Sequence, residues 1–281
     1  MSRGARGDSW MARAAARSQP CETLPMPSDA SPPAEKAASP FWTEVWETVK
    51  TLGAGLLIAL VLRVVVFQPN TIPSSSMEPG VVTGDYVLVS KWPYGWSRAS
   101  FPFDPPLFSG RVLGRAPKRG DVIVFRLPRD PDVPYIKRLI GLPGDRVQIV
   151  KGQVFVNGKP NARQFTGWAR DHDDPGRIVP KVVETNVDGS RYLTFGGAPD
   201  GEADDTDVYV VPPGHYFFMG DNRDNSLDSR WPEEVGVGFV PAENLVGRAE
   251  MVLLSWKAGA SVLKPWTWLN LDPHRFFLRL K

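Results

Sequence analysis

Three consecutive serines, Ser74, Ser75 and Ser76, follow a proline at the end of a long apolar segment. If this stretch is extended, successive side chains point to opposite sides, so Ser74 and Ser76 share one face and Ser75 has the other. Two hydroxyl groups on one face can supply a nucleophile and a hydrogen-bond donor for an oxyanion. A polar loop beside a proline has the same composition, so the serines alone leave both interpretations open.

A serine nucleophile needs a base, and none of the chain's three histidines lies in a triad motif such as Gly-x-Ser-x-Gly, although His215 precedes an apolar strand. A neutral lysine is the other option. In YIKRLI, Lys137 would share a strand face with Tyr135 and Leu139, and apolar neighbours lower the pKa of a lysine. A surface lysine on an edge strand would show the same pattern.

A third polar stretch, MGDNRDNSLDSR from Met219 to Arg230, separates two apolar strands. It fits an ordinary loop with Asx turns, or a hydrogen-bonded shelf beside an active site. In the second case a serine hydroxyl orients the lysine amine and an Asp/Arg pair holds the shelf in place.

The three polar stretches must be positioned by helices and strands. The first of these elements along the chain is a predicted helix. The segment from Thr51 to Phe67 is apolar except for Arg63, and its helical length of about 25 Å grows when preceding residues are included. We therefore expect a transmembrane helix over 45–67, with a buried helix of a soluble core as the alternative. Basic residues gather before it and are absent just after it, which predicts a disordered cytoplasmic tail over 1–44 and export of the rest.

The remaining chain is typical of a β-rich domain. Short apolar or alternating runs are separated by turn signals, among them Asn157-Gly158, which predicts a two-residue hairpin loop. We expect a mainly β catalytic domain of antiparallel sheets over 68–256, with a polar insertion over 161–207. The acidic runs of the insertion suit solvated loops, and a calcium site is the alternative. The aromatic and basic tail 257–281 either covers one end of the β domain or dips into a bilayer interface.

The composition limits the functional classes. A net charge of +2 gives no support for nucleic-acid binding, and the single cysteine rules out an intrachain disulfide. No Cys/His cluster has metal-ligand spacing, so we predict no metal site.

Four stretches in this order after an apolar segment resemble the bacterial type I signal peptidases (leader peptidases), which are Ser-Lys serine endopeptidases. IPSSSMEPG is similar to the serine box of that family, GDYVLVSKWPYG to the strand box that follows, RGDVIVFRLPRDPDVPYIKRLIGLPGD to the lysine box, and GDNRDNSLDSR to the last box. The resemblance covers roughly residues 60–160 and 207–256.

The resemblance implies a role for each matching residue. Ser76 is then the nucleophile, Ser74 an oxyanion donor together with the N–H of Ser76, Lys137 the general base and Ser226 the residue that orients the lysine, while Ser75 faces away. The other matching positions are the supporting pair Asp228 and Arg230 and the substrate-binding residues Ile72, Met77, Val81, Tyr135 and Ile136. Asn70 departs from the apolar residue of some relatives, which affects the pocket for the substrate's −3 residue.

The implied function is removal of signal peptides from exported preproteins, with small residues at −3 and −1, without metal or cofactor. The partners are then signal peptides and the lipid bilayer. The location is the bacterial inner membrane, crossed once, with a cytoplasmic N-terminus and an extracytoplasmic catalytic domain. Two rivals remain: another Ser-Lys peptidase of narrow specificity, and a non-enzymatic membrane-anchored module that binds extended peptides.

Overall fold

The computed structural model describes residues 41–102, 104–106, 108–171, 176–196, 201, 203–257, 260 and 264–280. Residues 51–281 form one compact unit, and of the preceding unit only 41–50 are described. The expected tail lies outside the described residues as far as residue 40, as do parts of both acidic runs of the insertion.

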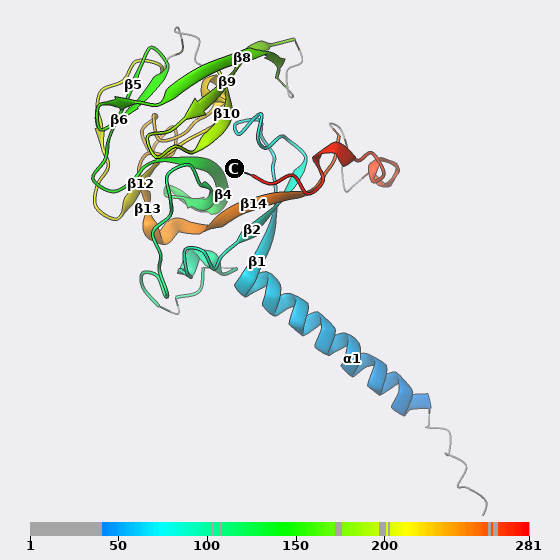
Figure 1. The fold of residues 1–281 in the computed structure, drawn as a ribbon. Coiled ribbons are helices and arrows are strands. Elements are labelled where there is room, and N and C mark those ends of the chain that lie inside the picture. Colours follow the sequence, from blue (N-terminus) through cyan, green and yellow to red (C-terminus); the bar gives the residue numbers. More distant parts are fainter. Residues whose placement is uncertain are drawn as a thin grey trace, which may run out of the picture. The chain divides into compact units, whose positions relative to one another are not determined.

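One helix within this part of the chain is long and apolar enough to cross a membrane. It comprises α1 (Phe41–Val61) and the π-helical turn η1 (Leu62–Val66), 26 residues or about 39 Å. None of its residues is buried against the protein, which disagrees with a core helix of a soluble domain and agrees with a membrane anchor. The helix passes directly into the first strand, β1 (Phe67–Thr71) (Figure 1).

Most of the domain is a seven-stranded antiparallel sheet with the order β1-β2-β14-β3-β4-β12-β13. The strands after β1 are β2 (Asp85–Ser90), β3 (Val122–Leu127), β4 (Asp130–Gly141), β12 (His215–Met219), β13 (Val240–Pro241) and β14 (Leu245–Ser255). The first half of β4 is exposed and the second half is buried, so the strand runs from the solvent into the core. The expectation of a mainly β fold of antiparallel sheets is confirmed.

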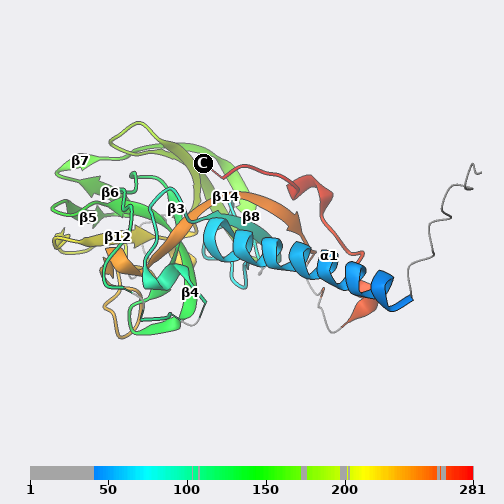
Figure 2. The ribbon, with the colours of Figure 1, turned by 90° about the horizontal axis from the view of Figure 1, so that it is seen from below.

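Two smaller antiparallel sheets complete the domain (Figures 1 and 2). Their strands are β5 (Arg146–Val150), β6 (Gln153–Val156), β7 (Lys159–Pro160) and β11 (Tyr209–Val210) in one sheet, and β8 (Ala162–Arg170), β9 (Ile178–Thr185) and β10 (Arg191–Phe195) in the other. Asn157 and Gly158 both have positive φ and join β6 to β7, as their sequence predicts. Much of the expected polar insertion is therefore a sheet of its own.

Short 3₁₀ turns lie between strands and near the C-terminus, namely η2 (Arg98–Ser100), η3 (Arg223–Asn225), η4 (Ala242–Asn244), η5 (Pro265–Thr267) and η6 (Pro273–Arg275). The C-terminal segment returns along β14, where the N–H of Leu280 donates to the carbonyl of Glu250 (Figures 1 and 2). Arg275 pairs with the buried Asp85 at 2.6 Å. Trp266 and Phe277 stay 79% and 69% exposed, so this segment covers the sheet with its basic and aliphatic side chains while these aromatic rings face outward.

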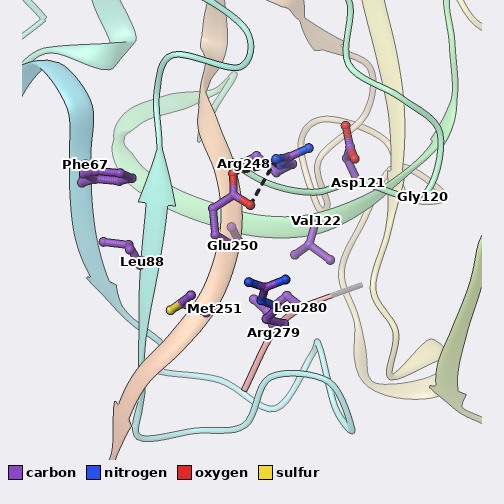
Figure 3. A pocket seen from close by; sticks show the side chains of 11 residues that line it. Phe67, Leu88, Gly120, Asp121, Val122, Arg248, Glu250, Met251, Arg279 and Leu280 are labelled. Carbon is purple, nitrogen blue, oxygen red and sulfur yellow. Dashed lines mark hydrogen bonds and ion pairs between the residues drawn. The ribbon is translucent and has the colours of Figure 1, made fainter. Parts of the chain in front are cut away.

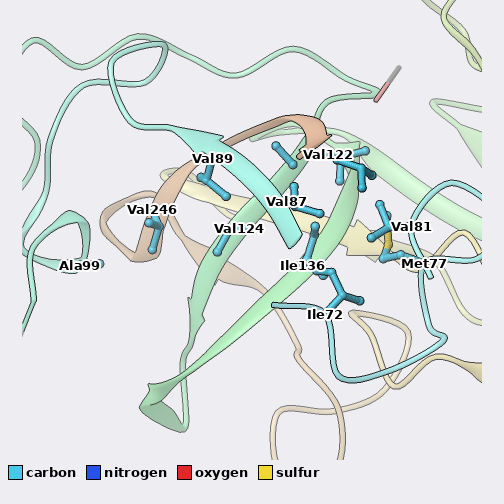
Figure 4. Close-up of a cluster of buried hydrophobic side chains, with 12 residues drawn as sticks. Ile72, Met77, Val81, Val87, Val89, Ala99, Val122, Val124, Ile136 and Val246 are labelled. Carbon is cyan, nitrogen blue, oxygen red and sulfur yellow. The ribbon is translucent and has the colours of Figure 1, made fainter. Parts of the chain in front are cut away.

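The core has three hydrophobic clusters, and one of them underlies the serine triplet (Figure 4). It joins Ile72, Met77 and Val81 from the segment after β1 to Ile136 on β4 and to valines of β2, β3 and β14. Burial of so many apolar side chains fixes the serine segment against the strand that carries Lys137.

Candidate active site

The side chains of Ser76 and Lys137 meet although 61 positions separate them in the chain. The Lys137 amine lies 2.6 Å from the Ser76 hydroxyl and also donates to the carbonyl of Ile136 at 3.1 Å. Both side chains are almost completely buried. They line a cleft of about 510 Å³, from which this otherwise buried pair can be reached.

Burial controls the charge of Lys137. It lowers the pKa of the amine to about 8, against the opposing effect of the Asp228 and Asp221 carboxylates and with a smaller contribution from the Arg230 guanidinium. An amine with this pKa is partly neutral near physiological pH, which is the form that can accept a proton.

The chain bends at Ser75 and turns from Ser76 onward, so the triplet is not the continuous extended segment from which the alternation of its side chains was predicted. The Oγ atoms of Ser74 and Ser76 lie 3.4 Å apart, on the same side. Ser75 points away from them, is buried, and its Oγ accepts a hydrogen bond of 2.8 Å from Asn225. Ser75 therefore attaches the triplet to the stretch Met219–Arg230, which we call the shelf.

The shelf packs closely on the serine segment at Gly220. A Cβ at this position would lie 2.3 Å from the Ser226 Oγ and 2.5 Å from the Ser76 carbonyl oxygen, so only glycine fits. The Asn222 N–H donates to that same carbonyl at 3.1 Å. The Ser226 hydroxyl is buried without a hydrogen-bond partner among the described residues, and Ser226 lines the cleft together with Lys137.

Buried ion pairs hold the shelf. Asp228 pairs with Arg230 at 2.8 Å and accepts from the Gly220 N–H at 2.9 Å. Burial acts to raise the pKa of Asp228, but Arg230 and these N–H donors outweigh it and keep the pKa below the usual range. Asp221 pairs with Arg138, the neighbour of Lys137, at 2.6 Å.

A further buried pair joins the shelf to the insertion sheet. Glu184 on β9 pairs with Arg223 at 2.7 Å and also accepts from Asn161 and from Tyr192. This connection was not predicted from the sequence, and neither were the roles of Gly220 and Asn225. The signal for the latter two was their place inside the polar motif, whereas nothing in the sequence marks Glu184.

The residues expected to bind substrate divide into two groups. Tyr135 and Ile136 line the cleft, and the Tyr135 ring lies 5.4 Å from the Lys137 amine. Ile72, Met77 and Val81 are buried beneath the surface and do not line it. Asn70 pairs with β2 at Val87, and its Oδ1 is buried without a partner among the described residues.

Among the described residues, the histidines and the second cleft are not placed for the same chemistry. His215 and His274, the histidines within the described ranges, do not line the cleft, and His172 lies outside these ranges. The cleft of about 640 Å³ in Figure 3 has no serine, threonine or cysteine in its lining, and its Arg248 pairs with Glu250 at 2.9 Å. Within the described part of the chain, no group of three His, Cys, Asp or Glu side chains is placed to hold a metal ion.

A β-rich domain behind one apolar helix, with a serine and a buried lysine in contact, defines a class of membrane-anchored serine peptidases. The family model described as "Signal peptidase, peptidase S26" matches residues 45–256. The chain therefore belongs to the signal peptidase family, and it is a serine peptidase that removes signal peptides.

Individual relatives agree with the family. Signal peptidase I of Rickettsia typhi is 42% identical over 210 residues, which covers 72% of this chain and 77% of the relative, and that of Rickettsia canadensis is 40% identical over 216 residues, or 74% and 79%. The crystal structure of a signal peptidase I from Enterococcus faecalis V583 aligns with 48% of this chain and 97% of its own, at 26% identity and a TM-score of 0.29. The predicted resemblance is confirmed by the family and the sequence relatives.

Proposed function

We propose that Ser76 is the nucleophile and Lys137 the general base with which this enzyme cuts signal peptides from exported preproteins. The observation that carries the proposal is the 2.6 Å contact between the lysine amine and the serine hydroxyl inside the cleft. A base within hydrogen-bond distance of a hydroxyl can take its proton when the base is neutral.

The substrate binds in the cleft as an extended strand. Residues 134–137 of β4 pair with β3 on one edge only, because β12 joins β4 from Arg138 onward. The other edge of these residues faces the cleft and is open to a peptide backbone within the described structure. Strand addition at such an edge supplies main-chain hydrogen bonds and points alternate side chains into the wall.

Small side chains at −3 and −1 suit this geometry. In an extended substrate these two residues point the same way, toward the wall that contains Ile136. The apolar cluster of Ile72, Met77 and Val81 lies directly behind and leaves little depth for a long side chain. We infer that the pockets accept residues of the size of alanine, with Asn70 changing the polarity near the −3 residue.

The reaction proceeds in two steps. Neutral Lys137 takes the proton of the Ser76 hydroxyl while Oγ attacks the carbonyl carbon of the −1 residue, and the Ser74 hydroxyl and the Ser76 N–H stabilise the oxyanion. The lysine gives its proton to the leaving amine of the mature protein, which leaves the signal peptide as an ester on Ser76. Lys137 then accepts a proton from water, the hydroxide cleaves the ester, and the proton returns to Ser76.

Ser226 and the Asp228–Arg230 pair complete the site. A protonated lysine amine has three donors, of which two go to Ser76 and Ile136. We assign the third to the Ser226 hydroxyl, which reaches the amine once a substrate closes the cleft, since catalytic hydrogen bonds often tighten only in the complex. Asp228 and Arg230 keep the shelf and Ser226 in place.

The active site works outside the cytoplasm, with α1 and η1 crossing the inner membrane and the N-terminus on the cytoplasmic side. The basic residues before the helix support this orientation. The segments proposed are a tail over 1–44, a membrane helix over 45–67, a catalytic domain over 68–256 that includes the insertion 161–207, and a C-terminal segment over 257–281.

The test compares neighbouring serines. Detergent-solubilised wild type, Ser76→Ala and Ser75→Ala are incubated with one preprotein that has alanine at −3 and −1, and the products are identified by mass spectrometry. We expect a single cut after −1 by the wild type, no cut by Ser76→Ala, and most of the activity in Ser75→Ala. Full loss in Ser75→Ala with activity kept in Ser76→Ala would reverse the assignment. Binding of the preprotein without any cut by the wild type would favour a peptide-binding module.

A further inference from the structure

The stretch GDYVLVSKWPYG resembles a family box, yet none of its residues lines the catalytic cleft. It contains β2 and the turn that leads toward η2. Its lysine, Lys91, is only 1% exposed and takes no part in the proposed reaction. A buried lysine is costly unless its donors are satisfied, so its partners show what it is for.

The partners of Lys91 and of Trp96, the residue directly after this stretch, include carbonyl groups at the end of the membrane helix. The Lys91 side chain donates to the carbonyl of Val64 at 2.9 Å, and its backbone N–H donates to that of Val66 at 3.0 Å. The indole N–H of Trp96 donates to the carbonyl of Val65 at 2.7 Å. Three successive carbonyl groups thus bond to two residues of one loop.

Such carbonyls need partners for a physical reason. The last four carbonyls of a helix have no intrahelical donor, and where protein or lipid covers them water cannot supply one. Lys91 also donates to the carbonyl of Ser100, which ties the same amine to η2. Burial lowers the pKa of Lys91 to about 8, with smaller effects of Arg126 and Arg63, so the amine is mostly protonated near pH 7 and keeps three donors.

The hydrogen bonds of Lys91 and Trp96 lie at the start of the segment that connects the helix to Ser76. Ten residue steps separate Val66 from Ser76, and a free segment of that length spans up to about 35 Å. The hydrogen bonds to Val64, Val65 and Val66 fix the start of this segment, and the pairing of β1 with β2 fixes its course. Losing the side-chain donors would let the helix end rotate and tilt against the sheet.

We propose that Lys91 and Trp96 form a joint that sets the height of Ser76 above the bilayer and so selects preproteins by the spacing between their hydrophobic segment and the bond that is cut. The inference rests on the proposed function, because it assumes a substrate that is anchored in the same bilayer as the enzyme. Lys91 and Trp96 are positioning residues, since they act through the helix end and touch neither substrate nor reacting atoms.

The test uses two kinds of substrate. One is a series of preproteins with four, six, eight or ten residues between the hydrophobic segment and an Ala-x-Ala site, reconstituted with the full-length enzyme in phosphatidylcholine/phosphatidylglycerol vesicles. The other is a water-soluble peptide with the same Ala-x-Ala site and no hydrophobic segment. We expect the wild type to prefer one spacing at least tenfold, and Lys91→Met and Trp96→Phe to reduce this preference below threefold. Cleavage of the soluble peptide should stay within twofold.

Matched controls are Trp92→Phe, in the same box but half-exposed, and Lys159→Met on the exposed β7, and both should keep the wild-type spacing preference. Trp96→Phe provides the test if Lys91→Met does not fold.

An unchanged spacing preference in the variants, or an equal loss on both substrates, would overturn the joint. A wild type that cuts the soluble peptide but has no spacing preference would also overturn it while the proposed function stands. A wild type that cuts neither substrate would instead refute the proposed function.

Discussion

Lys91 and Lys137 have nearly the same burial and pKa but different surroundings. They are 1% and 3% exposed, and burial lowers the pKa of each to about 8. The side chain of Lys91 donates only to backbone carbonyls, which cannot give up a proton. Lys137 contacts a hydroxyl that can, at the wall of an open cleft. A low pKa therefore does not identify a lysine as a base. The group that the amine contacts and the access of a substrate to it do.

The largest expected difference between the two lysines is in catalysis. Lys137→Met keeps the approximate shape of the side chain and removes the base, so we expect kcat on the soluble peptide to fall by about 10⁴-fold or more. Lys91→Met should change the same constant by no more than about twofold. Initial rates measured by chromatography of the products provide the test. Comparable losses in both variants would erase the functional distinction between the two lysines.

Ser226 tests whether the third donor of Lys137 matters. A hydrogen bond to a charged group contributes about 2 kcal/mol, so Ser226→Ala should lower kcat about 30-fold if the hydroxyl holds the amine in the reacting enzyme. KM should hardly change, because the contact forms between enzyme groups. Ser229→Ala is the matched control on the same shelf, since the Ser229 hydroxyl bonds to the Phe218 N–H and lies outside the cleft lining. If Ser226→Ala kept the wild-type kcat, the role of Ser226 would be limited to packing.

The pH dependence of kcat/KM also distinguishes Lys137 from Lys91. Only the neutral amine of Lys137 accepts a proton, so kcat/KM should rise about tenfold per pH unit below a midpoint near 8 and then level off. Lys91 titrates in the same range, so the wild-type profile cannot assign the midpoint to one lysine. Lys91→Met should keep the midpoint. A shift in that variant would assign the midpoint to Lys91, and a midpoint near 6.5 would indicate a histidine.

The local features could be predicted from the sequence because each depends on only a few neighbouring residues. The turn at Asn157-Gly158 follows from backbone geometry alone, whereas Ser74 and Ser76 share a side although the chain bends at Ser75 between them. The strand patterns and family boxes indicated a β-rich domain and placed Lys137 on a strand. Whether that lysine meets Ser76 depends on how β4 packs against the serine segment, which no local pattern determines.

The features that were missed depend on contacts between distant segments. Glu184 looks like a solvated carboxylate of a polar insertion, yet it is buried against Arg223 and Tyr192. Lys91 ends an apolar strand and has the sequence appearance of an ordinary surface lysine. Its side-chain partners are the carbonyl of Val64, 27 positions earlier, and that of Ser100 in η2. A buried charge is visible only when both partners and the surrounding apolar side chains are placed together.

The smallest expected effect separates the two lysines by stability. Lys91→Met leaves the carbonyls of Val64 and Ser100 without their donor, and each unsatisfied buried carbonyl costs about 1–3 kcal/mol. Differential scanning fluorimetry in detergent should show a Tm about 5 °C below that of the wild type.

Lys137→Met removes an amine whose burial is itself unfavourable. It also removes a donor to the Ile136 carbonyl, but Ile136 lines the cleft, where water can replace the amine, and the Ser76 hydroxyl keeps Ser74 as a neighbour at 3.4 Å. The Tm of this variant should stay within about 2 °C of the wild type or rise. Lys159→Met on the exposed strand β7 serves as the reference for removing a lysine charge alone. If Lys137→Met were the less stable of the two variants, Lys137 would be the structural lysine, and the contrast with Lys91 would be reversed.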